Sequence, residues 1–489
     1  MSTPQVSNYY LGDGGAFLYP LVRDYLGWRN SMVDTLQQCL KEQPENLMAL
    51  IIDLGSSLHR TDLALNHETY TKKMQNIMTI FEKQTTGQDN SRMLQLHIQA
   101  LQAWMNGQYR YATEIWEDLL KMDTFDAIAL KFAYDGYFYL GDSENICKSV
   151  ERHVENYNDE RCVPMEIYGY ILGMYAFGLE ETYQYKEAEQ AAIKAIAINK
   201  DDAWAMHAWV HVREMEGDVS HGIEFMKTEE SVWSTCAALS CHMYWHWCLF
   251  LWDQGKFDEV LKIYDEKISV HMESLAPLDL VDASSLLYRL YLDGIIDKKD
   301  SRWKKVRQCW STMLCSHTFA FNDAHILMVY NDRSDENVSK MLDEQWQSLE
   351  NYLLSSSNQV ENGSNETKVI ENDSKKVYQQ VGIATCKAID LYNYDHFTES
   401  AKLLQLLVPT GKLKMIGGSH AQRDVFELIF IHAVFECCSM VPPQGSDQWD
   451  VVKKLLEMRK SRKPNSGKVK RLYDKFYQLS NLNFHTNSL

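Results

Sequence analysis

The sequence predicts an all-α protein built from stacked helical hairpins. Apolar residues make up 45% of its 489 residues, so a large core can be buried, and only nine residues are proline. The chain shows no long alternation of Val, Ile or Thr with polar residues, which is the pattern of half-buried strands. Instead, a pattern of glycine, aromatic and small residues recurs along it.

The recurring pattern fits the tetratricopeptide repeat, a two-helix unit of about 34 residues. The matching stretches are GQYRYATEIW (107–116), YKEAEQAAIKA (185–195) and GKFDEVLKIY (255–264). The glycine closes the turn, the aromatic ring fills the gap between the two helices, and the small residue lets their backbones approach. These matches place the clearest repeats at 94–127, 169–202 and 241–274.

One hairpin does not bury its own apolar face, so neighbouring hairpins are expected to stack into a right-handed solenoid with a concave groove. The segment SSSNQVENGSNETKVIENDSKK is polar and lacks an apolar period, which predicts a disordered insertion within the array. The expected organisation is an irregular arm (1–22), a repeat array (23–354), this insertion (355–376), further helical pairs of the same array (377–480) and a tail (481–489).

Charge and cysteine usage exclude some classes of partner. The net charge of −18 repels phosphate backbones, so we expect no nucleic-acid partner. The basic run at 453–471 is interpreted as a solvated face with a linker, and the alternative is a patch that binds an anion or a partner. The eleven cysteines form no CxxC pair, which indicates free thiols in a reducing compartment. With no signal peptide and no run of about 18 apolar residues, we expect a cytoplasmic protein without a membrane partner.

The stretch 201–267 carries the main chemical signal. His207, His211 and Glu214 share one side of a predicted helix, and His242 and His246 share a face of another. Paired histidines at this spacing are the usual helical way to offer two metal ligands. Three interpretations remain open: histidines that satisfy each other or backbone carbonyls in an aromatic core, a polar ligand pocket, and a metal site. A site with four ligands requires the two helices to face each other.

Two other polar clusters lie at expected helix starts. In FNDAH (321–325), Asn322 or Asp323 is expected to cap a helix, and His325 follows. In GGSHAQRDVF (417–426), a Gly-Gly-Ser loop enters a helix beside Arg423, which fits either an ordinary cap or an anion site. The sequence holds no P-loop, GxGxxG or GxSxG motif, so nucleotide binding and serine hydrolysis lack support from motifs.

Six segments together resemble the tetratricopeptide repeat protein 38 family over about residues 25–475. They are LKFAYDGYFYLG (130–141), DAWAMHAWVHVREMEG (202–217), CHMYWHWCLFLWDQGKFDEVLKIYD (241–265), DASSLLYRL (282–290), FNDAHILM (321–328) and GGSHAQRDVF (417–426). The resemblance implies an all-helical repeat protein with three recognisable repeats. It implies no reaction, and the polar insertion and the N-terminal arm lie outside it.

Two functions are therefore expected in order of preference. The first is a non-catalytic scaffold whose groove binds a protein or peptide, with a basic or apolar segment fitting the acidic chain best. It needs no cofactor. The second is a small-molecule- or metal-binding, possibly hydrolytic, protein with a pocket inside the superhelix. Its candidate residues are His207, His211, Glu214, His242, His246, Asp282, Asp323, His325 and Arg423, of which the four histidines in 201–267 are the candidate ligands of a divalent metal.

Overall fold

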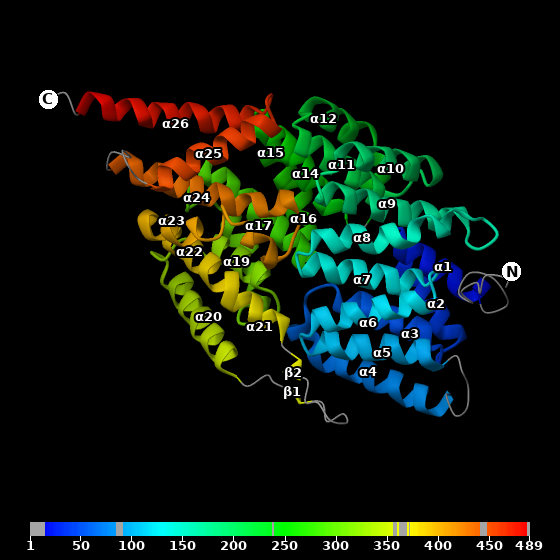
Figure 1. Ribbon diagram of the computed structural model, residues 1–489. Helices are drawn as coiled ribbons and strands as arrows, with labels where there is room; N and C mark the ends of the chain where they lie inside the picture. The colour runs from blue at the N-terminus through cyan, green and yellow to red at the C-terminus, as the bar shows by residue number, and fades with distance from the viewer. Residues whose placement is uncertain are drawn as a thin grey trace. The chain divides into compact units, whose positions relative to one another are not determined.

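A computed structural model describes residues 15–84, 91–236, 239–355, 359–360, 369–370, 372–440 and 447–486. Most of these residues lie in helices, which confirms the all-α prediction. The chain divides into two compact units (Figure 1). The first unit comprises 1–212, 229–240 and 356–376, and the second comprises 213–228, 241–355 and 377–489.

The first unit is a series of antiparallel helical hairpins, in which consecutive helices pack against each other. Figure 1 shows α4 to α9 lying side by side. Its main helices are α1 (Gly15–Leu26), α2 (Met32–Glu42), α3 (Leu47–Leu58), α4 (Leu63–Gln84), α5 (Ser91–Met105), α6 (Tyr109–Met122), α7 (Ala127–Tyr139), α8 (Ser143–Val154), α9 (Met165–Glu181), α10 (Tyr185–Ile198) and most of α11 (Ala203–Glu216), with the single turn α13 (Glu230–Trp233).

The predicted hairpins 94–127 and 169–202 coincide with α5–α6 and α9–α10. Gly107 joins the first pair with a φ of 73°, a left-handed conformation that costs glycine little. Ala112 and Trp116 of the matched pattern are fully buried. Close approach also explains Gly178 on α9, because an added Cβ there would lie 2.8 Å from the Cα of Cys147 on α8. This glycine lets the backbones of α8 and α9 approach closely.

The second unit is also helical. Its helices are α12 (Val219–Thr228), α14 (Ser240–Asp253), α15 (Phe257–Ile263), α16 (Ser269–His271), α17 (Pro277–Leu292), α18 (Arg302–Trp310), α19 (Ala320–Val329), α20 (Glu336–Leu354), α22 (Ile383–Asn393), α23 (Phe397–Gln405), α24 (His420–Met440), α25 (Asp447–Arg462) and α26 (Gly467–Thr486). Gly255, with a φ of 74°, joins α14 to α15 as the pattern at 241–274 predicts. Helix α17 packs against α18, α19 and α24.

The N-terminal arm differs from the prediction where the structure describes it. The arm at 1–22 was expected to be irregular, but its residues from Gly15 onward belong to α1. Leu18, Leu21 and Val22 are buried there, and this apolar stripe outweighs Pro20 inside the helix. The tail at 481–489 is helical as far as Thr486. Residues 1–14 and 487–489 lie outside the described residues.

The insertion at 355–376 is partly ordered, in contrast to the prediction. Strands β1 (Gln359–Val360) and β2 (Val369–Ile370) pair antiparallel, and α21 (Asp373–Val377) follows them. Asn372 caps α21 by accepting from the backbone N–H of Lys375. The Asp373 N–H donates to the Gly107 carbonyl at 2.9 Å, so this segment is tied to the α5–α6 turn. Residues 356–358, 361–368 and 371 lie outside the described part of the chain.

The basic run at 453–471 is only partly a solvated face. Lys468 is buried and its Nζ donates to the Asp424 carboxylate at 2.8 Å. Arg459 also pairs with Asp424, from α25. Two of the run's cations therefore serve to dock α25 and α26 on α24.

Among the described helices, none combines the length and hydropathy that a bilayer span requires.

Candidate functional site

The predicted site residues fall into several neighbourhoods. His207 and His211 belong to the first unit, and Glu214, His242, His246, Asp282, Asp323, His325 and Arg423 belong to the second. A metal ion shared by the two histidine pairs would need residues of both units, so this site stays a prediction.

His207 and His211 lie on α11 in an aromatic environment and are both buried. The His207 ring stacks on Phe177 at a centroid distance of 5.5 Å and lies 4.7 Å from Trp204. His211 approaches Phe177 edge-on. The aromatic residues of this stretch thus pack the core, as one of the three interpretations expects.

His211 also belongs to a buried His/Glu cluster that could bind a metal ion. Its Nδ1 lies 3.4 Å from an oxygen of Glu180, at the end of α9. One ligand atom each from Glu180, Glu181 and His211 lie within 4.8 Å of one another, and all three residues are buried. The Glu181 carboxylate also accepts from the Ser143 hydroxyl.

The sequence reasoning missed Glu180 and Glu181. The available signal was a pair of acidic residues that ends an otherwise apolar run, IYGYILGMYAFGLEE (167–181). Burying two neighbouring carboxylates is costly unless cations or hydrogen bonds compensate them. The position of the pair therefore indicates that hydrogen-bond donors or a cation face it.

His242 and His246, on α14, form a hydrogen-bonded chain with two carboxylates. His242 Nδ1 lies 2.7 Å from Asp282 of α17, and His246 Nδ1 lies 2.9 Å from Glu214. The two Nε2 atoms lie 3.2 Å apart. Because ionised carboxylates only accept, each Nδ1 carries a hydrogen. The Nε2 contact then requires either a hydrogen on one of the two atoms or a cation between them.

Arg289 of α17 adds a buried positive charge beside this chain. Its guanidinium is fully buried, donates to the carbonyls of Ser285 and Ala421, and stacks over Trp245. Burial lowers the pKa of Arg289, while Asp424, Glu214 and Asp282 favour its charged form. No sequence motif indicated Arg289, because an arginine in an apolar helix has no characteristic spacing.

The prediction that Asn322 or Asp323 caps a helix is wrong, because both residues lie inside α19. Phe319 precedes α19, and its side chain makes no capping hydrogen bond. Asp323 instead accepts from His317 Nδ1 at 2.6 Å and from the Tyr378 hydroxyl at 2.8 Å. His325 Nδ1 lies 2.7 Å from the Phe321 carbonyl, and burial lowers its pKa to about 3. His325 is therefore a neutral core residue.

The Gly-Gly-Ser loop is an ordinary helix cap. Ser419 Oγ accepts from the Gln422 N–H, and Gln422 Oε1 accepts from the Ser419 N–H, which is a capping box. The Arg423 guanidinium donates to the carbonyl of Gly418. These contacts favour the cap over an anion site.

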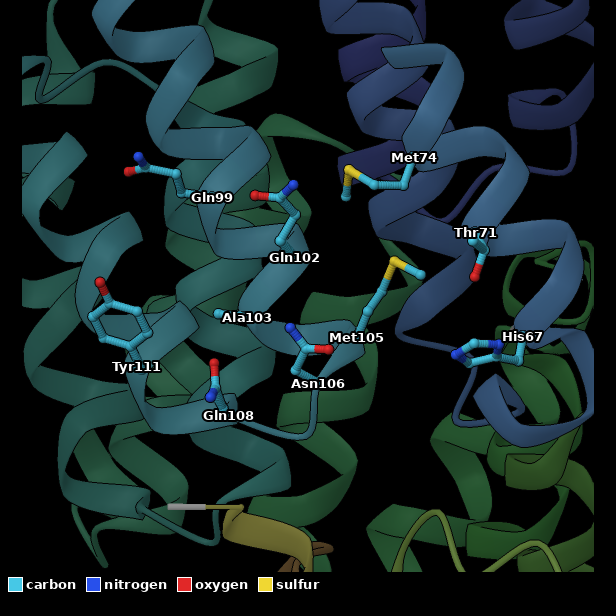
Figure 2. Close-up of a pocket in the computed structure, with 10 residues that line it drawn as sticks. All are labelled: His67, Thr71, Met74, Gln99, Gln102, Ala103, Met105, Asn106, Gln108 and Tyr111. Atoms are coloured by element: carbon cyan, nitrogen blue, oxygen red, sulfur yellow. The ribbon is translucent and has the colours of Figure 1, made fainter. Parts of the chain in front are cut away.

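A cavity of about 500 Å³ lies in the first unit, and none of the predicted site residues lines it (Figure 2). Helix α4 contributes one wall, α5 a second, and the α5–α6 turn with the start of α6 a third. Its ten lining residues include no Asp, Glu, Lys or Arg; they are His67, Thr71, Met74, Gln99, Gln102, Ala103, Met105, Asn106, Gln108 and Tyr111.

Asp202, at the start of α11, is a buried carboxyl group that should make the stability of the protein depend on pH. Its Oδ1 accepts from the Ala205 N–H at 3.0 Å, and burial raises its pKa to about 7. A raised folded-state pKa gives stability that is full below the unfolded value of 3.8 and is lost as the pH rises through 7.

Asp202→Asn keeps the oxygen that caps the helix. We therefore expect the free energy of unfolding of this variant to increase relative to that of the wild type as the pH rises. Between pH 5 and 8.5 the wild type should lose about 2–3 kcal/mol relative to the variant. Urea unfolding at both pH values measures this difference. A difference that does not change with pH would show that Asp202 is ionised throughout.

No family model matches the chain. The resemblance to the tetratricopeptide repeat protein 38 family therefore rests on the quoted segments and stays a prediction.

Proposed function

We propose that the chain is a scaffold whose first unit binds an extended, uncharged stretch of a protein partner. The cavity beside α5 carries this proposal. The ten lining residues include no Asp, Glu, Lys or Arg, and only His67 can take up a positive charge. The cavity therefore suits a neutral segment better than a basic one. A volume of about 500 Å³ is in the range of binding pockets.

The amides of the lining match the chemistry of a peptide backbone. Gln99 and Gln102 share one face of α5, at i and i+3, and Asn106 follows them in the turn directly after the helix. Each side-chain amide offers two donors and one acceptor, so it can bond a backbone N–H and C=O together. Seven residues of helix rise about 10 Å, which is the length of about three residues of extended chain.

Selection from a phage library of random peptides of about twelve residues tests this function. We expect enriched sequences without net charge, and we expect Gln102→Leu to raise their Kd at least about tenfold by fluorescence polarisation. Gln95→Leu, a half-exposed glutamine on α5 that does not line the cavity, is the matched control. No enrichment, or equal binding by both variants, would exclude the cavity as the site.

The finer architecture and location belong to the same proposal. The hairpins α5–α6 and α9–α10 and the glycine turns support a tetratricopeptide-like, right-handed solenoid related to the tetratricopeptide repeat protein 38 family. The cysteines, all of them free thiols, support a cytoplasmic location. The acidic net charge supports a protein partner rather than a nucleic acid.

A second candidate function is metal binding by Glu180, Glu181 and His211. One imidazole with two carboxylates suits zinc or manganese, and three protein ligands leave a position for water. A divalent cation would also neutralise the two buried carboxylates. The histidines His207, His242 and His246 remain further candidate ligands from the sequence pattern.

Metal analysis of the full chain tests this second function. After incubation with zinc or manganese and dialysis, we expect at least one ion per chain, and Glu181→Gln should reduce the retained metal. Glu187→Gln, an exposed residue of the next helix, is the control. A wild type that retains neither metal would exclude the site.

A further inference from the structure

Three side chains of the second unit form a hydrogen-bonded chain of hydroxyl, imidazole and carboxylate. The Ser348 hydroxyl oxygen lies 3.0 Å from His317 Nε2, and His317 Nδ1 lies 2.6 Å from an Asp323 oxygen. This is the order and spacing of a nucleophile, its general base and the carboxylate that orients the base. The three come from α20, the loop before α19, and α19 itself.

The carboxylate fixes which ring nitrogen of His317 faces the serine. Asp323 is buried and also accepts from the Tyr378 hydroxyl at 2.8 Å. Because the carboxylate accepts, His317 Nδ1 carries the hydrogen, and Nε2 presents a lone pair to the Ser348 hydroxyl. A buried carboxylate beside the ring also stabilises the imidazolium that forms when the serine gives up its proton.

The backbone holds His317 in an unusual conformation. Its φ is 48°, in the left-handed region that side chains other than glycine rarely occupy. Such a residue persists where its surroundings fix it, and these positions concentrate at functional sites. The rings of Tyr352 and Tyr378 lie 5.7 and 6.3 Å from the imidazole, so the ring is held on two sides.

A fourth polar side chain ties the helix of Ser348 to the loop that carries His317. Gln345 lies one turn before Ser348 on α20, and its Oε1 accepts from the Cys315 N–H at 2.6 Å. Gln345 is buried, so this bond fixes the helix against the loop.

We propose that Ser348, His317 and Asp323 form a nucleophilic centre that transfers the acyl group of an uncharged ester to water. The Ser348 oxygen attacks the ester carbonyl carbon while its proton passes to His317 Nε2. The alkoxide leaves with that proton, which gives an alcohol and an acyl-serine. Water then attacks the acyl-serine, His317 accepts the water's proton and returns it to the serine oxygen, and a carboxylic acid is released.

The proposal goes beyond the binding function, because it concerns other residues in the second unit. Ser348 and His317 are catalytic residues in it, and Asp323 is a positioning residue. Ser348 is half-exposed, so an ester can reach it from solvent. The neighbouring tyrosine rings favour an apolar or aromatic acyl group over a charged one.

A fluorophosphonate probe, which modifies activated serines, tests the centre in the full-length chain. We expect stoichiometric labelling of Ser348, located by mass spectrometry of the proteolytic peptides, and hydrolysis of p-nitrophenyl acetate. Ser348→Ala should abolish both. Ser339→Ala is the matched control, since Ser339 is also half-exposed and lies on the same helix.

His317→Gln separates catalysis from structure. A folded His317→Gln protein, judged by circular dichroism, should label at least about tenfold more slowly. If this variant does not fold, His317→Asn replaces it, with the same expected loss of labelling rate. An unlabelled Ser348, or undiminished labelling of a folded His317 variant, would overturn the proposal.

Discussion

Replacing Asp424 with asparagine should lower the free energy of unfolding by about 3 kcal/mol. Asp424 accepts from Arg459 at 2.5 Å and from Lys468 at 2.8 Å, and Arg289 is a further cation near it. Those three cations are mostly buried. Asparagine keeps the shape of the side chain but removes the only charge that Lys468 pairs with among the described contacts. Uncompensated buried cations account for the loss.

The pH dependence of this effect has a fixed sign. Arg459, Lys468 and Arg289 hold the pKa of Asp424 well below its ordinary 3.8, against the opposing effect of burial. A depressed folded-state pKa gives stability that is present above pH 3.8 and is lost as the pH falls toward the folded value. The difference between wild type and Asp424→Asn should therefore shrink below pH 3.8.

Urea unfolding of Asp424→Asn and of Asp474→Asn makes the comparison. Asp474 is exposed on α26, so its replacement should change stability by less than about 0.5 kcal/mol. If Asp424→Asn behaves like Asp474→Asn, the cluster of α24, α25 and α26 does not hold these helices together.

The second large effect is expected at the buried pair His242–Asp282. Asp282 is fully buried, and His242 donates to it at 2.7 Å. His242→Phe leaves the carboxylate buried without this donor, which should cost about 3 kcal/mol or more. Asp282→Leu should be costly for the opposite reason, since the imidazole loses its acceptor. Replacing both residues together removes the charge and both polar groups.

A double-mutant cycle measures the coupling. The double variant should be destabilised by at least about 2 kcal/mol less than the sum of the two single variants. In the double variant, neither the Asp282 carboxylate nor the His242 imidazole stays buried without its partner. Unfolding by urea gives the four free energies. Additive effects would show that the pair contributes no coupling and that each residue acts through packing alone.

The sequence predicted correctly that the chain is helical and where several hairpin turns lie, because both features depend on residues close together in the chain. Gly107 and Gly255 adopt the left-handed turn that the repeat pattern needs. The prediction was wrong where longer contacts decide, as at Gly15–Leu26 and at Asp373, whose backbone hydrogen-bonds Gly107 far away in the sequence. Periodicity does not report such contacts.

The candidate site was predicted in part. The helical spacing of His242 and His246 correctly places both on one face, where their Nε2 atoms meet. Their carboxylate partners lie on other helices, 32 and 40 residues away in sequence, at no characteristic spacing. Ser348 and His317 are likewise 31 residues apart, so no motif could have indicated them. Asp323 was singled out as a possible cap, but its partners are His317 and Tyr378.

Hydrogen–deuterium exchange with a selected peptide tests the proposed binding function most directly. The scaffold account predicts that the peptide slows exchange in α4, α5 and the start of α6, which line the cavity in the first unit. Exchange in the second unit should stay unchanged, and Gln102→Leu should abolish the protection. Protection confined to any other helices, or protection that survives in Gln102→Leu, would contradict the account.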